Sequence, residues 1–388
     1  MPSHSPYFFL TAAEHSGDTL GAALIGALRQ KFPEAEFRGV GGPLMEAAGC
    51  TLLANPVKRS AMLAGALLTQ SWYWWKLMKL IRRHLSGAAD EQGRKPDVVV
   101  PIDSSFVNLR IAAAAKAGGL PVCYYVAPQI WASRPGRIKR IRASVDTLCC
   151  VLPFEEKYFG ERGVNAVYVG HPMFDHAVTQ ETSSDLPHGP GGGPNIAIFP
   201  GSRRAEIDAH TSAMLKILRE IKGRHPRAKF LAAAPSEERA WQIRRHLRTG
   251  NVSVDIRVGD GDAVIAWADL VLCKSGTTTL QVARHAKPMV VIFSVPWWQW
   301  IVAKHLIHTR YIALVNILAG REVVKEFVPY AGRALPVARA CLDLLGSADQ
   351  RERMSSDLRQ LTQTLMPREG ILAADRVAAE AGKLLKQD

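Results

Sequence analysis

Two short turns in the second half of the sequence carry glycine, hydroxyl groups and a cation in an order that suits a phosphate group. The first, residues 199–206 (Phe-Pro-Gly-Ser-Arg-Arg-Ala-Glu), ends an apolar run and leads directly into a helical pattern. Backbone N–H groups at a helix start point towards an anion, and an arginine adds a cation that can form two parallel hydrogen bonds. A plain turn with a capping serine and surface arginines is the alternative. We predict that Gly201, Ser202 and Arg203 bind a phosphate group.

The second turn, residues 272–281 (Leu-Cys-Lys-Ser-Gly-Thr-Thr-Thr-Leu-Gln), has the same arrangement. The amides and hydroxyls of Ser275, Gly276 and Thr277 suit a diphosphate, and Gln281 lies one helical turn further on, within reach of a ribose hydroxyl. Helix capping is the alternative. Two such turns in one domain favour a nucleotide diphosphate as the ligand. Neither GxxxxGK(S/T) nor GxGxxG occurs, which argues against ATP hydrolysis and dinucleotide redox chemistry.

The first half of the sequence places polar side chains after its opening apolar run. Glu14, His15, Ser16 and Asp18 follow this run and precede a helical pattern. Carboxylates and hydroxyls at such a turn can bind sugar hydroxyl groups, although Ser16 or Asp18 can instead cap the helix. We predict that these four residues contact a sugar.

Asp103 closes a second apolar run, residues 98–102, and is followed five residues later by Asn108. A carboxylate at a strand end can accept the proton of an attacking hydroxyl, and it can equally cap the next helix. His171 lies in a Gly-His-Pro sequence, residues 170–172, where the chain leaves the first half. It either reaches a substrate or is a solvated turn residue held by the proline.

Six of the nine tryptophans fall into two clusters, and each cluster is followed by cations. The first cluster comprises Trp72, Trp74 and Trp75 with Lys76, Lys79 and Arg82, and the second comprises Trp297, Trp298 and Trp300. Aromatic rings beside cations are typical of the headgroup layer of an anionic bilayer. A buried aromatic core is the alternative.

Short apolar runs alternate with helical patterns in both halves, which predicts an α/β fold with parallel sheets. The predicted strands are 7–10, 97–102, 122–126, 147–151 and 166–169, then 195–199, 229–233, 252–258, 270–272 and 289–293. Predicted helices begin near Thr19, Asn108 and Arg137 and span 205–224, 237–248 and 277–285. Two doubly wound domains in tandem would leave a cleft between them, and the carboxyl ends of the strands of both sheets would face this cleft.

The predicted domain boundaries follow from composition. Residues 1–180 form the first Rossmann-like domain, 181–194 are a linker rich in Ser, Pro and Gly, and 195–335 form the second Rossmann-like domain. Residues 336–388 are a helical tail that crosses back to the first domain or to a partner chain, as in a homodimer.

Composition limits the classes of partner. The 388 residues suffice for two domains, and the net charge of +14 indicates an anionic partner such as nucleic acid, anionic lipid or a phosphorylated substrate. No zinc-finger spacing, RNP-like aromatic motif or basic low-complexity arm supports nucleic acid. The six cysteines lack CxxC spacing, which favours reduced thiols over disulfides or zinc. No apolar stretch reaches the roughly 18–20 residues of a spanning helix, so we expect a soluble or peripheral protein.

With these residues in hand, the sequence resembles the lipid-A-disaccharide synthases, a family (family 19) of GT-B glycosyltransferases. The resemblance runs from the first predicted strand to about Phe327. Its motifs are 14–18 (Glu-His-Ser-Gly-Asp), 41–43 (Gly-Gly-Pro), Asp103 with Asn108, 127–132 (Ala-Pro-Gln-Ile-Trp-Ala), 134–137 (Arg-Pro-Gly-Arg), 152–155 (Leu-Pro-Phe-Glu), 170–172, 200–203, 275–277 and 316–322 (Asn-Ile-Leu-Ala-Gly-Arg-Glu).

The resemblance implies an inverting transfer of 2,3-diacylglucosamine from its UDP form onto 2,3-diacylglucosamine 1-phosphate in lipid A biosynthesis. The products would be a β-1,6-linked disaccharide phosphate and UDP, with no metal or other cofactor. The enzyme would work as a peripheral protein at the cytoplasmic face of the inner membrane. Asp103 matches the essential aspartate of the family, and Arg203 matches its essential arginine.

The resemblance also extends the predicted binding residues. It adds His171 to the predicted donor-binding residues, which already include the two phosphate-binding turns and Gln281. Asn316, Arg321 and Glu322 join the acceptor and sugar side.

Four positions depart from the family pattern. His15 replaces an alanine, Phe106 an aspartate, Ser133 a tryptophan and Gln281 a glutamate. These positions lie near the predicted substrates, so they bear on acceptor and acyl-chain specificity more than on the fold.

Three alternatives remain open. They are a paralogous GT-B enzyme acting on another lipid-linked sugar, a UDP-sugar epimerase, and a catalytically inactive lipid-binding protein. The two tryptophan clusters argue against an epimerase, because an epimerase needs no membrane surface. Asp103 and Arg203 argue against an inactive protein.

Overall fold

The computed structural model describes residues 5–58, 67–88, 93–176, 186, 192–248, 252–294, 301, 307, 309–367 and 370–385, with side chains omitted at 67–71. The chain divides into two units. The first unit comprises Met1–Asp175 with Leu365–Asp388, and the second comprises His176–Thr364. The predicted second tryptophan cluster, Trp297, Trp298 and Trp300, and most of the predicted linker lie outside the described residues.

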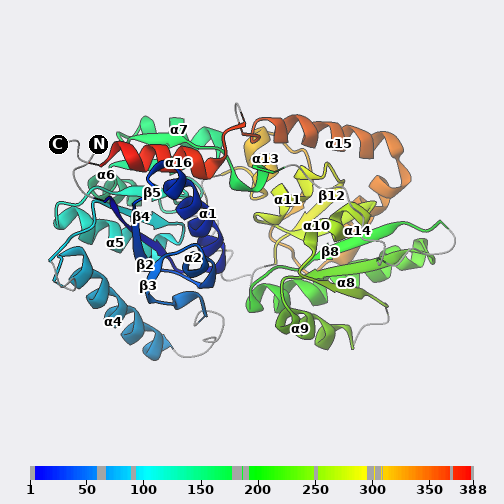
Figure 1. The fold of residues 1–388 in the computed structure, drawn as a ribbon. Coiled ribbons are helices and arrows are strands. Elements are labelled where there is room, and N and C mark those ends of the chain that lie inside the picture. The colour runs from blue at the N-terminus through cyan, green and yellow to red at the C-terminus, as the bar shows by residue number, and fades with distance from the viewer. Residues whose placement is uncertain are drawn as a thin grey trace. The chain divides into compact units, whose positions relative to one another are not determined.

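The first unit contains a seven-stranded sheet whose paired strands are all parallel (Figure 1). Its strands are β1 (Tyr7–Ala12), β2 (Glu36–Val40), β3 (Thr51–Ala54), β4 (Val98–Ile102), β5 (Cys123–Tyr125), β6 (Thr147–Cys150) and β7 (Ala166–Tyr168). The spatial order is β3-β2-β1-β4-β5-β6-β7. Strands β1 and β4 are buried along their whole length, as the near-continuous apolar sequence of a central parallel strand requires.

Helices cover this sheet. They are α1 (His15–Lys31), α2 (Pro43–Ala47), α4 (Leu67–Leu85), α5 (Ser105–Ala117), η1 (Pro135–Arg137), α6 (Ile138–Ser144), α7 (Pro153–Gly160), η2 (Pro172–Phe174) and α16 (Ala373–Lys383). Helix α5 packs against β4, α4 and α6. Gly17 favours close packing of α1 on β1, because a Cβ there would lie 3.2 Å from the Cβ of Ala12, a tight contact. The close approach of helix and strand brings the first turn of α1 to the end of β1.

The second unit contains a six-stranded parallel sheet in the order β10-β9-β8-β11-β12-β13. Its strands are β8 (Asn195–Phe199), β9 (Lys229–Ala234), β10 (Asp255–Val258), β11 (Leu270–Lys274), β12 (Met289–Ile292) and β13 (Lys325–Phe327). Its helices are α8 (Arg204–Arg224), α9 (Glu237–Leu247), α10 (Gly261–Trp267), α11 (Thr278–Arg284), α13 (Leu314–Ala319), α14 (Ala334–Gly346) and α15 (Ala348–Gln363).

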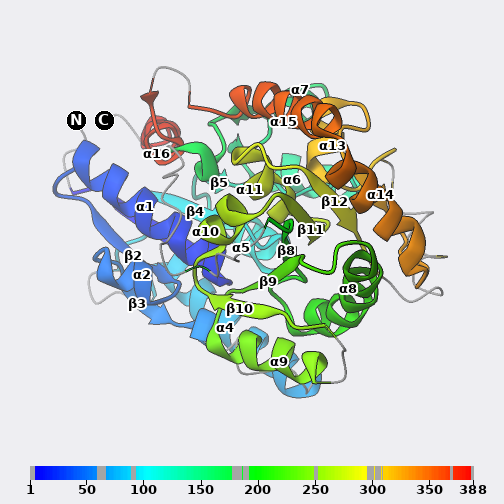
Figure 2. The same ribbon diagram turned by 90° about the vertical axis from the view of Figure 1, so that its right-hand side faces the viewer.

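The predicted helical tail, residues 336–388, is divided between the units. Helix α14 packs against α8 and β12, and α15 packs against α11 and α13, so both belong to the second unit (Figure 2). Only α16 belongs to the first unit, where it packs against α1, β5 and β6. The apolar faces of α14 and α15 are covered by the neighbouring second sheet and its helices, which explains why the crossing occurs later than the sequence predicted.

The strand order reverses once in each sheet, between β1 and β4 in the first and between β8 and β11 in the second. The register pairs Ala12 with Ile102 and Phe199 with Cys273, so the turns that follow these strands begin side by side. Ligands of open α/β sheets bind at such reversal points, beyond the carboxyl ends of the strands. The fold therefore confirms the predicted two Rossmann-like domains, and it places the chemistry-bearing turns of each unit at one such point.

Candidate active site

Asp103 directly follows β4 at the reversal point of the first unit, in a strained backbone. Asp103 and Ser104 have φ angles of 54° and 40°, in the left-handed region that residues other than glycine seldom adopt. Three hydrogen bonds hold the strained residue. The N–H of Asp103 donates to the carbonyl of Tyr125 (2.9 Å), and its own carbonyl accepts from the Tyr124 hydroxyl (2.7 Å) and from Asn108 Nδ2 (3.0 Å). Strand β5, which carries the two tyrosines, and helix α5, which carries Asn108, thereby fix the backbone of Asp103.

Asn108 is buried, and its amide is used entirely inside the first unit. Its Nδ2 also donates to the carbonyl of Ile102 (2.7 Å), and its Oδ1 accepts from the Thr11 hydroxyl (2.9 Å). The side chain therefore ties the end of β1 to the end of β4. This arrangement gives Asn108 a positioning role towards Asp103, and its predicted sugar contact stays a prediction.

The carboxylate of Asp103 faces the first turn of α1, where Ser16 Oγ donates to Asp103 Oδ2 (3.3 Å). Glu14, His15 and Ser16 are exposed at this turn. The predicted sugar-binding set is thus brought to Asp103 with one exception. Asp18 is buried and accepts three backbone N–H groups at the start of α2, from Gly42, Leu44 and Met45 (2.8–3.1 Å). It fixes α2, since its oxygens are already occupied.

The first turn of the second unit, after β8, is organised by a carboxylate that the sequence did not single out. Glu206 Oε2 accepts the backbone N–H groups of Ser202 (3.1 Å) and Arg203 (3.3 Å). A glycine is needed at Gly201, which has a φ of 125° and where a Cβ would lie 2.7 Å from Glu206. The two amides predicted to bind phosphate therefore bind Glu206. The Arg203 side chain is 69% exposed, with Nη1 3.9 Å from Glu206 Oε1.

Lys274 connects the first turn to the second. Its Nζ lies 3.0 Å from Glu206 Oε1, and both side chains are largely buried. Burial alone would raise the pKa of Glu206, but the Lys274 ammonium and the two backbone donors outweigh burial and hold this pKa below its ordinary value. Glu206 is therefore ionised at neutral pH, and the ion pair links the ends of β8 and β11.

At the second turn, one of the hydroxyl groups predicted to bind a diphosphate forms a hydrogen bond within the second unit. The Ser275 hydroxyl is buried and donates to the carbonyl of Ile312 (3.1 Å), whereas Thr277 is exposed at the start of the short helix α11. Gly276 has a φ of 142°, a conformation that favours glycine. Of the predicted hydroxyl groups at this turn, the one of Thr277 therefore faces solvent.

Gln281 belongs to a cluster around Asp262, another residue that sequence reasoning missed. Its Nε2 donates to Asp262 Oδ1 (3.2 Å), His285 Nε2 lies 2.7 Å from the same oxygen, and Arg284 lies 4.0 Å from Oδ2. The His285 hydrogen bond is the main reason that the pKa of Asp262 lies below its ordinary value. A carboxylate and an amide at this edge can both bind ribose hydroxyls.

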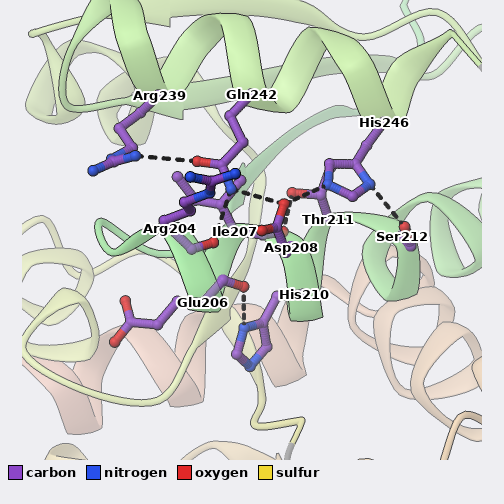
Figure 3. Close-up of polar contacts among 10 residues, drawn as sticks. All are labelled: Arg204, Glu206, Ile207, Asp208, His210, Thr211, Ser212, Arg239, Gln242 and His246. Carbon is purple, nitrogen blue, oxygen red and sulfur yellow. Dashed lines mark hydrogen bonds and ion pairs between the residues drawn. The ribbon is translucent and has the colours of Figure 1, made fainter. Parts of the chain in front are cut away.

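Residues of α8 and α9 form a separate polar network (Figure 3). Asp208 Oδ1 accepts from Gln242 Nε2 (2.7 Å) and lies 2.9 Å from His246 Nε2, while His246 Nδ1 lies 3.1 Å from the Ser212 hydroxyl. The order resembles a Ser-His-Asp triad. However, Ser212 lies inside α8, where helical hydrogen bonds use the backbone N–H groups that an oxyanion would need. The network fixes α9 against α8, and we assign it no catalytic role.

His171 and His210 are both held neutral by burial. Burial lowers the pKa of His171 to about 4, and its Nδ1 accepts the N–H of Met173 (3.2 Å) at the start of η2. His210 Nδ1 donates to the carbonyl of Glu206 (2.7 Å), and Nε2 accepts the N–H of Ser294 (2.9 Å). Burial likewise lowers the pKa of His210. In the described structure His171 is a cap of η2, and its predicted donor contact stays a prediction.

The predicted motif 316–322 fixes a loop of the second unit. Asn316 is fully buried; its Oδ1 accepts the N–H groups of Val323 (2.8 Å) and Val324 (3.0 Å), and its Nδ2 donates to the Val324 carbonyl (2.9 Å). Arg321 forms an ion pair with Asp357 (2.8 Å). These contacts give Asn316 a positioning role.

Glu322, from the same motif, forms an ion pair with Lys325 (2.7 Å). No group of three His, Cys, Asp or Glu side chains suited to a metal ion occurs among the residues that the structure describes.

The first tryptophan cluster lies on α4, an amphipathic helix. Its inner face buries Leu77, Ile81 and Leu85 in the first unit. Trp72 is 57% exposed and Trp75 is 61% exposed, and the ammonium groups of Lys76 and Lys79 lie over their rings at 3.6 and 5.7 Å from the centroids. No helix within the described part of the chain is long and apolar enough to cross a membrane.

Comparison with known proteins agrees with this architecture. A family model described as lipid-A-disaccharide synthetase matches residues 8–381. The lipid-A-disaccharide synthase of Alkalilimnicola ehrlichii is 35% identical over 381 residues, covering 96% of this chain and 98% of that protein. The enzyme of the same name from Idiomarina loihiensis is 33% identical over 346 residues, covering 88% and 89%.

Among solved structures, S. aureus MnaA with UDP has a similar fold, with a TM-score of 0.62 and 12% identity over 96% of this chain and 94% of that one. Its low identity makes it evidence of the fold alone, the two-domain GT-B architecture. The two curated relatives and the family model extend over nearly the whole chain and both units. The chain belongs to the lipid-A-disaccharide synthase family of glycosyltransferases.

Proposed function

We propose that the protein transfers 2,3-diacylglucosamine from its UDP form to the 6-hydroxyl of 2,3-diacylglucosamine 1-phosphate, with inversion at the anomeric carbon. The observation that carries this proposal is the Asp103 carboxylate, held on a locked backbone at the reversal point of the first sheet. The relatives' name supports the reaction class, and the substrates are those that membership of the family implies.

In the proposed reaction, the oxygen of the acceptor 6-hydroxyl attacks the anomeric carbon of the donor sugar. Asp103 accepts the proton of this hydroxyl during the attack. The bond from that carbon to the diphosphate oxygen breaks, and UDP leaves with the electron pair. A general base of this kind contributes about 10²–10⁴ in rate. Asn108 fixes the backbone of Asp103, and the Ser16 hydroxyl orients its carboxylate.

The second unit would bind UDP. The backbone N–H groups of Ser202 and Arg203 are occupied by Glu206, so the exposed Arg203 guanidinium and the Thr277 hydroxyl are the groups we assign to the diphosphate. Negative charge grows on the diphosphate as the bond breaks, so a nearby cation stabilises the transition state more than the ground state. Gln281 and Asp262 would bind the ribose hydroxyls.

The protein would act as a peripheral enzyme on an anionic membrane surface. The exposed tryptophans and cations of α4 support this part of the proposal, because rings enter the headgroup layer while lysine and arginine bind anionic lipids. Water-insoluble diacyl substrates would reach the enzyme there.

The test is a transfer assay in neutral detergent micelles, with UDP release and disaccharide formation measured together by mass spectrometry. Disaccharide should form only when both substrates are present, with one UDP released for each. A UDP-sugar epimerase would change the donor sugar without an acceptor. Release of UDP at the same rate with and without 2,3-diacylglucosamine 1-phosphate would contradict the proposal.

A further inference from the structure

A groove on the first unit includes Ser104, the residue after Asp103, in its lining. It has a volume of about 1450 Å³, and Glu14 and Ser104 line one part of it. Helix α4 contributes Trp74, Met78 and Leu85 to its lining, and α5 contributes Val107, Leu109 and the small side chains of Ala113, Ala114 and Ala117. These apolar side chains on both helices line a space that can take a slender apolar group.

The charges that line the groove are of almost one sign. Lys79, Arg82, Arg110 and Arg140 contribute cations, and Glu14 is the single acidic side chain of the lining. The groove is therefore amphiphilic, since it combines an apolar lining with cations.

Two of these residues belong to a larger group that we call the arginine cluster, Arg110, Arg134, Arg137 and Arg140. Arg137 Nη1 lies 3.4 Å from the hydroxyl of Ser105, two residues beyond Asp103 in the chain. Burial lowers the pKa of Arg137, and the neighbouring guanidiniums of Arg134, Arg140 and Arg110 lower it further. The four cations thus lie close together, two of them in the lining of the groove and one at the hydroxyl of Ser105.

No carboxylate of the described residues forms an ion pair with any guanidinium of the arginine cluster. In the second unit, by comparison, Arg239, Arg244 and Arg321 each have a carboxylate partner. Like charges held together without counter-charge repel one another, and a multivalent anion relieves this repulsion. The planar guanidinium of arginine can donate two parallel N–H groups to two oxygens of one phosphate.

We propose that the arginine cluster binds the phosphate monoester of the acceptor lipid, and that the groove between α4 and α5 receives an acyl chain of the same molecule. This inference rests on the proposed function and names the groups that would select its acceptor. A phosphate monoester carries about −1.5 to −2 charges at neutral pH, more than a phosphodiester headgroup. With the phosphate on the arginine cluster and the chain in the groove, the sugar between them would lie at Asp103.

The test measures equilibrium binding without turnover. The probes are 2,3-diacylglucosamine with and without its 1-phosphate, each carrying a brominated acyl chain that quenches tryptophan fluorescence, in neutral detergent micelles with the full-length chain. The wild type should bind the phosphorylated probe about tenfold or more tightly than the other. Arg137→Gln and Arg140→Gln should remove this preference and leave the dephosphorylated probe unaffected. Arg162→Gln is the matched control, since Arg162 lies over the Tyr158 ring away from the groove.

The groove is tested separately by Ala114→Met, which should weaken binding of long-chain probes and leave short-chain probes unchanged. A uniform loss at every chain length would overturn the acyl assignment. Equal loss for both probes in Arg137→Gln would overturn the phosphate assignment. The phosphate assignment would also be overturned if Arg137→Gln weakened binding only to vesicles containing phosphatidylglycerol, because the cluster would then bind bilayer headgroups. Because binding is read without the donor, these outcomes are distinct from a failure of the wild type to form disaccharide.

Discussion

The two parallel sheets reverse their strand order in the same way, but the residues at the two reversal points carry charge differently. In the first unit a single carboxylate, Asp103, sits on a strained backbone with a serine hydroxyl as its side-chain partner. In the second unit Glu206 is paired with Lys274 and with two backbone N–H groups. One carboxylate faces a neighbouring hydroxyl, and the other is fully engaged in holding two turns together.

This difference shows that topology supplies the location of a site and local partners supply its chemistry. A carboxylate that organises a turn cannot also accept a proton from a substrate, because its lone pairs are occupied and its pKa is held low. Asp103 is instead positioned through its backbone, and the Ser16 hydroxyl donates to one of its oxygens. Under the proposed function, we therefore assign the acceptor to the first unit and the donor diphosphate to the second.

The largest effect is expected from Asp103→Asn, which removes the proposed base. The kcat should fall by about 10²–10⁴ while UDP affinity persists, because UDP is assigned to the other unit. The measurement combines steady-state transfer with calorimetric UDP binding. Asp97→Asn is the matched control, since Asp97 lies before β4 and accepts the N–H of Tyr7 (2.7 Å). A variant that keeps more than about a tenth of the wild-type kcat would reduce Asp103 to a structural turn residue.

Arg203→Ala should lower kcat/KM by about 10²-fold and weaken UDP binding less than that, because charge on the diphosphate is greatest in the transition state. Arg204→Ala is the control. Arg204 directly follows Arg203 in the chain, but it lies beside the polar network of α8 and α9. Comparing the loss in kcat/KM with the loss in UDP affinity separates stabilisation of the transition state from ground-state binding of UDP. Equal kinetics for the wild type and Arg203→Ala would place this arginine outside the site.

Lys274→Met tests the paired carboxylate through its pH dependence. Removing the ammonium leaves Glu206 partly buried without its main partner and should cost about 1–3 kcal/mol of stability at pH 7. The pKa of Glu206 lies below its ordinary value in the native state, so its pairing stabilises the fold above the ordinary pKa and is lost as pH falls through the native one. The difference in unfolding free energy between wild type and variant should therefore shrink below about pH 4.5.

Urea unfolding at a series of pH values gives this difference directly. Lys287→Met is the control, because Lys287 donates to the carbonyls of Ala266 and Ala268 and has no part in the Glu206 pair. Its stability loss should not follow the titration of Glu206, because the acidic group that interacts with Lys287 is Asp269. A pH-independent loss in Lys274→Met would mean that the ion pair does not govern the two turns.

The smallest effect is expected from Trp72→Ser with Trp75→Ser on α4. Vesicle affinity should fall by about tenfold, roughly 1.4 kcal/mol, while UDP binding and activity in micelles remain. Vesicle co-sedimentation across a salt series measures this. Trp241→Ser is the control, because Trp241 is 59% exposed and lies beside Arg245 in the second unit. An unfolded double variant would point to core roles, and unchanged vesicle binding would move the membrane contact elsewhere.

Much of the fold was predictable from the sequence, because the central strands are continuous apolar runs. Strand β8 coincides with the prediction, and β1, β4 and β12 lie within two residues of it. Strands β2, β3 and β13 were missed. Their sequences are short, and residues such as Arg38 and Lys325 interrupt the apolar pattern on which strand prediction depends.

The sequence located candidate site residues where the signal was local, and their roles stay predictions. Asp103, Ser16, Gly201 and Arg203 stand at turns that begin where a strand pattern ends, and the structure brings them to the reversal points. The sequence did not indicate Lys274, although it lies inside a predicted phosphate-binding turn, because nothing local distinguishes an ion-paired lysine from a solvated one.

What the sequence alone determined is therefore the alternation of elements and the turns that carry polar groups, since hydrogen-bonding periodicity and burial are encoded over a few neighbouring residues. The tertiary structure decided which polar groups are used up and which stay available. Thr11 and Asn108 are 97 residues apart, and Glu206 and Lys274 are 68 apart, yet each pair forms one contact. Only folding sets such distances, because partners across a sheet are chosen by strand order, which no local pattern records.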